Sequence, residues 1–122
     1  MEQRRLTPQI VSTIDAAARN RRLHISPITA WEIGMLASKG RTPITQHASN
    51  YFQAVLDKTG AHLTKLDIPI FIASSYLPGN IHGDPMDRIL IETARKQDLV
   101  LVTSDRAILA YGRQGHVKTL AC

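Results

Sequence analysis

Residues 99–103, with the sequence Leu-Val-Leu-Val-Thr, constrain the fold of this chain more than any other segment. Four of the five residues are apolar, which is typical of a strand that is covered on both faces. Helical patterns stand on either side, because apolar side chains recur at helical spacing over residues 85–97 and a short helix is expected over residues 104–111. The segment therefore predicts a central strand of an α/β domain with a mostly parallel sheet.

The rest of the chain continues this alternation of helices and strands. Thr7 and Pro8 have the character of an N-cap and a first helical residue, so we expect a helix over residues 8–19. The other expected elements are a short strand at 23–25, a helix opened by Pro27 and Thr29 and closed by Gly40, a helix over 45–58 closed by Gly60, a weak strand at 61–66, a helix over 68–76 and a last strand at 117–121. No linker or repeat interrupts them, and 122 residues suffice for one compact core. We therefore expect a single domain over residues 1–122.

Charge and composition narrow the possible partners. The chain carries 15 Lys and Arg against 10 Asp and Glu, a balance that favours an anionic partner such as RNA and is also compatible with a basic protein whose charge only maintains solubility. Cys122 is the only cysteine, which excludes an internal disulfide and a cysteine-rich zinc site. No segment approaches the roughly 20 apolar residues of a membrane span, and none reads as a signal peptide. We expect a cytoplasmic protein without a membrane partner.

Acidic residues recur at the starts of the expected helices. In a parallel α/β sheet these starts lie beside the carboxyl ends of the strands, where such folds bind ligands. Each acid alone also suits a structural role, such as a capping box formed by Thr29 and Glu32 or a residue at the positive end of a helix dipole. Taken together, they predict carboxylates that converge on one edge of the sheet. The four residues are Glu32, Asp84, Asp87 and Asp105.

Converging carboxylates have a chemical consequence. Like charges repel one another unless a cation neutralises them, and a set of oxygen ligands suits a hard ion such as Mg²⁺ or Mn²⁺. Such an ion polarises a phosphoryl oxygen and makes a bound water easier to deprotonate. The pattern therefore predicts metal-dependent hydrolysis of a phosphodiester.

Three segments resemble, in the same order, motifs of PIN-domain ribonucleases of the VapC toxin type. SPITAWEIGMLASKGR at residues 26–41 is similar to the family segment in which a glutamate follows a tryptophan. HGDPMDRILIETA at residues 82–94 and LVLVTSDRAILAYG at residues 99–112 are similar to the motifs of the third and fourth acids. The resemblance implies a PIN-like three-layer α/β/α domain with a mostly parallel sheet. It also implies an endoribonuclease toxin of a VapBC-type toxin–antitoxin system that uses Mg²⁺ or Mn²⁺, cleaves RNA, is held inactive by a cognate VapB-type antitoxin and forms a homodimer.

The same resemblance assigns roles to individual side chains. Asp84 becomes a helper ligand or a cap, and the Thr103 hydroxyl hydrogen-bonds a metal-bound water or a carboxylate, with Ser104 as a substitute or an N-cap. Arg88 contacts a phosphate, balances the acids or forms a salt bridge on the helix surface. His82 contacts RNA or is a solvated loop residue. The catalytic, metal-binding residues are Glu32, Asp87 and Asp105.

One departure from the family pattern is marked. The family usually opens with an apolar strand carrying an aspartate, in a motif like LLDTH, ahead of the helix expected here at residues 8–19. This sequence shows no such strand, so we expect a site that is one ligand short and little nuclease activity from the chain as written. The alternative is a catalytically weak or inactive PIN-like module that binds antitoxin or RNA. A receiver-like phosphorylation domain also clusters acids at strand ends, but no phospho-acceptor aspartate stands on a central strand.

Overall fold

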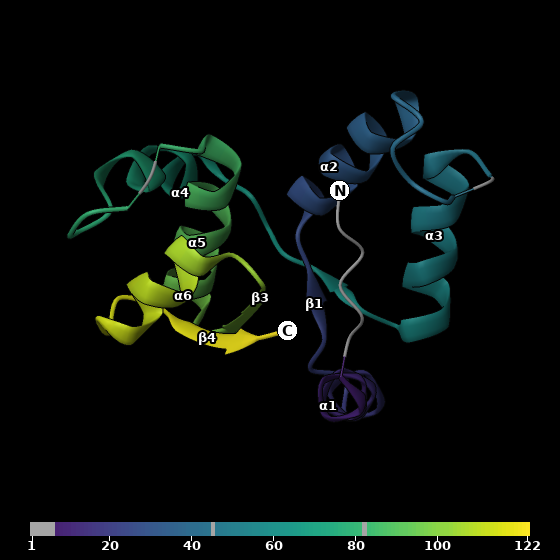
Figure 1. The fold of residues 1–122 in the computed structure, drawn as a ribbon, viewed down its shortest axis with the longest axis horizontal. Coiled ribbons are helices and arrows are strands. Elements are labelled where there is room, and N and C mark those ends of the chain that lie inside the picture. The colour runs from purple at the N-terminus through teal and green to yellow at the C-terminus, as the bar shows by residue number, and fades with distance from the viewer. Residues whose placement is uncertain (1–6, 45, 82) are drawn as a thin grey trace. The chain divides into compact units, whose positions relative to one another are not determined.

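The computed structural model describes residues 7–44, 46–81 and 83–122, and the chain forms two compact units, Met1–Thr64 and Lys65–Cys122 (Figure 1). Each unit combines helices with a pair of short strands, and in each pair the strands are parallel. This confirms the α/β class with parallel strands. No helix among the described residues is long and apolar enough to cross a membrane.

In the first unit, helix α1 begins where the sequence predicted. The Thr7 hydroxyl accepts a hydrogen bond from the Ile10 amide at 3.2 Å, and Pro8 occupies the first helical position, where its missing N–H is no loss. Strands β1 and β2 pair with His24 opposite His62, and α2 contacts α3. The elements of this unit are α1 (Pro8–Arg19), β1 (His24–Ile25), α2 (Pro27–Ser38), α3 (Ala48–Thr59) and β2 (His62–Leu63).

The cap of α2 and the start of α3 differ from the prediction, whereas α2 begins at Pro27 as expected. The cap of α2 is Ser26, whose hydroxyl accepts from the Ile28 amide at 3.1 Å, so the capping box of Thr29 and Glu32 is wrong and Glu32 is the sixth residue of the helix. Ser26 is the cap because its backbone is extended and it directly precedes Pro27, and proline is favoured as the first residue of a helix. Helix α3 begins at Ala48 rather than at residue 45, which lies outside the described residues.

The second unit is built around the parallel pair of β3 and β4, with Val100 opposite Lys118 and Thr103 opposite Ala121. Its core cluster contains Ile91 and Tyr111, which are essentially inaccessible to solvent. The predicted helix over residues 85–97 is confirmed. The elements are α4 (Ile68–Ala73), the 3-10 helix η1 (Ser74–Tyr76), α5 (Pro85–Gln97), β3 (Val100–Thr103), α6 (Arg106–Arg113) and β4 (Lys118–Ala121).

Within the second unit, strand β3 packs one face against the core. Val100 is 54% exposed and Val102 is 39% exposed, whereas Leu101 packs against the core cluster. Among the described residues β3 pairs with β4 and with no other strand. The prediction that β3 is a central strand covered on both faces stays a prediction.

Two helical glycines give a test of this packing. A Cβ atom on Gly112 in α6 would lie 2.6 Å from the Thr119 Oγ1 and 2.8 Å from its Cγ2, and a short branched side chain in a strand has little room to move. We expect Gly112→Ala to lower the free energy of unfolding by about 1–3 kcal/mol, as overpacked cores do.

Gly34 in α2 is the matched control, because a Cβ there meets nothing within 4 Å. Gly34→Ala should raise the free energy of unfolding by about 0.5–1 kcal/mol, since alanine loses less conformational entropy in a helix. Chemical denaturation followed by circular dichroism measures both variants. Equal effects of the same sign would contradict the close contact of Gly112 with Thr119.

Candidate active site

Two acids stand at the start of α5. Asp84 is the N-cap, and its Oδ1 accepts hydrogen bonds from the amides of Met86 at 2.9 Å and Asp87 at 3.4 Å. Pro85 follows at the first helical position, and Asp87 lies in the first turn, half-buried. The capping role predicted for Asp84 is thus confirmed. Both carboxylates lie at the positive end of the helix dipole, which stabilises negative charge.

Asp105 is held at the start of α6 by contacts from both sides. Its Oδ1 accepts from the Ile108 amide at 2.9 Å, and its own amide donates to the Thr103 hydroxyl at 3.0 Å. The Thr103 carbonyl in turn accepts from the Cys122 amide at 3.1 Å, at the end of β4. The cap is therefore Asp105 rather than Ser104, which corrects the predicted helix start at residue 104. Thr103 contacts the backbone of Asp105, a role that the sequence did not predict.

The starts of α5 and α6 belong to the same edge of the strand pair. Helix α5 contacts β3 and is joined to it through Asp98 and Leu99, so the helix runs back along the strand. Its first turn therefore lies toward the carboxyl end of β3, where Asp105 also stands. This arrangement places the helix starts that carry Asp84, Asp87 and Asp105 at one edge of the second unit, and the convergence of their carboxylates there stays a prediction.

Glu32 lies on α2 in the first unit, where it is half-buried. The prediction that Glu32 lies close to Asp87 and Asp105 stays a prediction. Within either unit, the described residues contain no group of three or more His, Cys, Asp or Glu side chains that could hold a metal ion. His82 lies outside the described residues.

Arg88 binds backbone carbonyls next to the acids. Its Nε donates to the Ser74 carbonyl at 2.9 Å and its Nη1 donates to the Ile81 carbonyl at 3.3 Å. The side chain thus ties α5 to η1 and to the segment at residues 77–81, which leads toward Asp84. Sequence reasoning missed this role, because the acceptors are 14 and 7 residues away and a carbonyl leaves no signature in a sequence.

Tyr111 holds the same segment from α6. Its hydroxyl donates to the Pro78 carbonyl, and its ring stacks on the His116 ring with centroids 4.5 Å apart. Burial raises the pKa of the Tyr111 phenol above 10.0, while the charges of Arg95 and Arg88 act in the opposite direction. Arg88 and Tyr111 therefore fix the segment before the α5 acids from two sides.

The family comparison is decisive at this point. The PIN domain family matches residues 4–114, which covers most of both units. This chain belongs to the PIN-domain family. PIN domains are generally nucleases that need divalent metal ions, and PIN nucleases act on RNA. Separate searches of curated proteins and of solved structures found no match. The PIN-like α/β fold predicted from the sequence is confirmed.

Removal of the Arg88 guanidinium tests its structural role in this PIN domain. Glutamine is shorter than arginine and uncharged, so Arg88→Gln cannot keep the hydrogen bonds to the Ser74 and Ile81 carbonyls. We expect the free energy of unfolding to fall by about 2 kcal/mol. Arg106→Gln at the exposed start of α6 is the control, and a surface substitution of this kind should stay within about 0.5 kcal/mol. Urea denaturation measures both. Equal stabilities of the two variants would show that the carbonyl contacts contribute little.

The Tyr111 phenol gives the fold a dependence on alkaline pH. Its pKa in the folded chain lies above the ordinary value of 10.0, so the folded state holds the proton more tightly than the unfolded state. This stabilising contribution is fully present below about pH 10 and is lost as the pH rises through the folded pKa. We therefore expect the free energy of unfolding of the wild type to fall above about pH 10.

Tyr111→Phe removes the ionisable group and leaves the Pro78 carbonyl without this donor. At pH 7 the variant should be less stable by about 1–2 kcal/mol, and above about pH 10 its stability should fall less than that of the wild type. Urea denaturation at a series of pH values measures both effects. Parallel curves for the two proteins in alkali would exclude Tyr111 as the source of the dependence.

Proposed function

We propose that this chain is a metal-dependent endoribonuclease toxin of the VapC type, which acts in the cytoplasm and is held inactive by a VapB-type antitoxin. The family match gives the general activity, and the three motif segments in the VapC-like order support the specific one. The observation that supports the proposal most is that Asp87 lies in the first turn of α5 and that Asp105 caps α6 directly after β3.

The proposal treats both units as parts of one PIN domain over residues 1–122. Its support is the family match, which runs from residue 4 to residue 114 and so does not stop at the boundary after Thr64. A homodimer belongs to the same proposal and rests on the resemblance to VapC-type toxins.

The proposed metal ligands are Glu32, Asp87 and Asp105, with Asp84 beside them. All four donate oxygen only, which fits Mg²⁺ or Mn²⁺. Asp84 and Asp105 accept their helix-cap hydrogen bonds through Oδ1, and a carboxylate that caps a helix can also bind a cation. When bound, the ion supplies a Lewis acid that polarises the phosphoryl oxygen and eases deprotonation of the attacking water.

The contacts around the acids contribute to catalysis by positioning. Asp105 is held at its amide by Thr103 and at its carboxylate by the first turn of α6, so its place is set before any ligand binds. Arg88 fixes the segment that leads to Asp84 and Asp87. A displacement of about 1 Å in such a group can reduce a rate about a hundredfold. We therefore assign Thr103 and Arg88 as positioning residues.

Substitution of aspartate by asparagine separates metal binding from helix capping. Asn caps a helix about as well as Asp, so Asp105→Asn keeps the start of α6 and removes only the charge. We expect wild-type protein to gain up to about 2.7 kcal/mol of stability in Mn²⁺ at a hundred times its dissociation constant, and Asp105→Asn and Asp87→Asn to lose most of that gain. The same variants should reduce RNA cleavage at least about a hundredfold.

The control is Asp57→Asn on the exposed side of α3, which changes the net charge by the same amount. Thermal melts in Mn²⁺ are measured beside cleavage because they report metal binding independently of activity. A melting temperature that Mn²⁺ leaves unchanged, together with no cleavage by the wild type, would contradict the nuclease proposal. The remaining candidate would then be a PIN-like module that binds antitoxin or RNA without cleaving it.

A further inference from the structure

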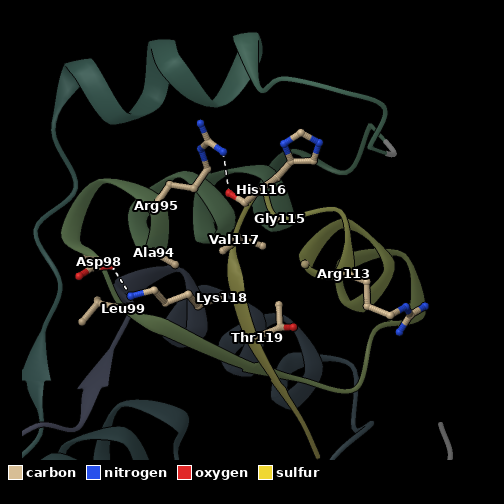
Figure 2. Close-up of a pocket in the computed structure, with 11 residues that line it drawn as sticks. Ala94, Arg95, Asp98, Leu99, Arg113, Gly115, His116, Val117, Lys118 and Thr119 are labelled. Atoms are coloured by element: carbon tan, nitrogen blue, oxygen red, sulfur yellow. Dashed lines mark hydrogen bonds and ion pairs between the residues drawn. The ribbon is translucent and has the colours of Figure 1, made fainter.

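A basic cavity lies at the opposite edge of the β3–β4 pair from the acids. It has a volume of about 680 Å³ and is lined entirely by residues of the second unit, from the end of α5, the end of α6 and the starts of β3 and β4 (Figure 2). Asp105 follows the carboxyl end of β3, whereas Leu99 and Lys118 lie at the amino ends. From Val100 to Thr103, the strand covers about 10 Å at roughly 3.3 Å per residue.

The charges on the cavity lining are mostly positive. Arg95, Arg113 and Lys118 line it together with the titratable His116, and Asp98 is the only acid on the lining. In Figure 2 the side chains of Arg95, Arg113 and Lys118 stand apart and extend in different directions. Cations that are spread in this way match a polyanion with separated charges better than one small anion.

The contacts of these cations differ in how easily they can be exchanged for a new partner. Arg95 already has two partners within the second unit, because its Nη1 donates to the His116 carbonyl at 2.6 Å and its Nε lies 3.4 Å from Glu92 Oε2. Lys118 Nζ contacts Asp98 Oδ1 at 2.7 Å, but the two side chains are 65% and 80% exposed. An ion pair this exposed is worth little, so a phosphate can replace Asp98 as the partner of Lys118.

Helix dipoles explain only part of this charge. Arg95 and Arg113 lie in the last turns of α5 and α6, where cations stabilise the negative ends of helices. Lys118 stands on β4 and has no such role. Val117 and Gly115 give the cavity a wall of apolar and backbone atoms beside these cations.

We propose that this basic cavity binds the phosphate backbone of single-stranded RNA, as a second contact remote from the carboxylates. The inference rests on the proposed RNA substrate. Arg113 and Lys118 each contact a phosphate, and the guanidinium fork of Arg113 suits two phosphate oxygens. A strand of a few nucleotides reaches from this edge to the edge of Asp87 and Asp105, so the cavity lengthens the bound RNA without taking part in cleavage.

The test is the salt dependence of RNA binding. Fluorescence anisotropy measures the affinity for a labelled single-stranded RNA of mixed sequence over a range of KCl concentrations in EDTA, which prevents cleavage. Each phosphate contact to single-stranded nucleic acid contributes about 0.7 to the slope of log affinity against log salt. The Arg113→Gln, Lys118→Gln double variant should therefore lower the magnitude of the slope by about 1.4. Arg113→Lys with Lys118→Arg keeps both charges and should retain the slope.

The matched control is Lys65→Gln with Lys96→Gln, two exposed lysines of the same unit that do not line the cavity and carry the same total charge. An equal loss of slope in both double variants, or no loss in either, would overturn the inference. Displacement of the RNA by inorganic phosphate at constant ionic strength would also overturn it, because the cavity would then be a small-anion site.

Failure of this inference is distinguishable from failure of the proposed function. Cleavage that depends on Asp105, combined with an unchanged slope in the cavity variant, removes the second contact and leaves the nuclease. A reduced slope in the cavity variant, combined with no cleavage by the wild type, removes the nuclease and leaves an RNA-binding surface. Circular dichroism melts of all variants confirm that each slope is measured on folded protein.

Discussion

The buried phenol of Tyr111 is the contact on which the second unit depends. Its ring lies in the core with Ile91 and Ile108, its hydroxyl donates to the Pro78 carbonyl, and its face stacks on His116. The hydrogen bond to Pro78 orders the segment that leads to the acids of α5. The stacking on His116 orders the residues that precede β4, beside the basic cavity. A buried hydroxyl is costly unless it is hydrogen-bonded, so the core is completed only when that segment is in place.

The acids of the second unit show how one residue serves both folding and chemistry. Asp84 and Asp105 satisfy amides at the starts of α5 and α6, and these caps stabilise the helices whether or not a metal binds. The cap also fixes the direction of the carboxylate. A side chain that is ordered in this way loses little further entropy when it binds an ion, which favours a preorganised site.

Local signals in the sequence predicted much of this fold. Thr7 with Pro8 and Asp84 with Pro85 located two helix starts to the residue, because a cap and a proline act on neighbouring atoms. Gly60 likewise ended α3, in the left-handed conformation with φ 64° that glycine adopts without strain. The helix-start positions of Asp84, Asp87 and Asp105 were predicted for the same reason, since a helix start is a local feature, whereas Glu32 is the sixth residue of α2.

The predictions that failed concern competition between neighbours or contacts between distant segments. Thr29 and Ser26 both suit a cap, and the choice fell to Ser26 because Pro27 follows it. The carbonyls that Arg88 and Tyr111 bind are invisible in a sequence, because every residue has one.

The separation of charge in the second unit follows from the direction of its helices. Helices α5 and α6 each begin at the carboxyl side of β3, so their positive ends lie at one edge and their negative ends at the other. Acids at the first edge and Arg95 and Arg113 at the second therefore stabilise the helices before any ligand is considered. Such an arrangement also suits a polyanion that is cleaved at one edge and held at the other. Folding and RNA binding thus favour the same charges at the helix ends, whereas Lys118 lies on β4, outside any helix, where it pairs with the exposed Asp98 and can exchange that partner for a phosphate.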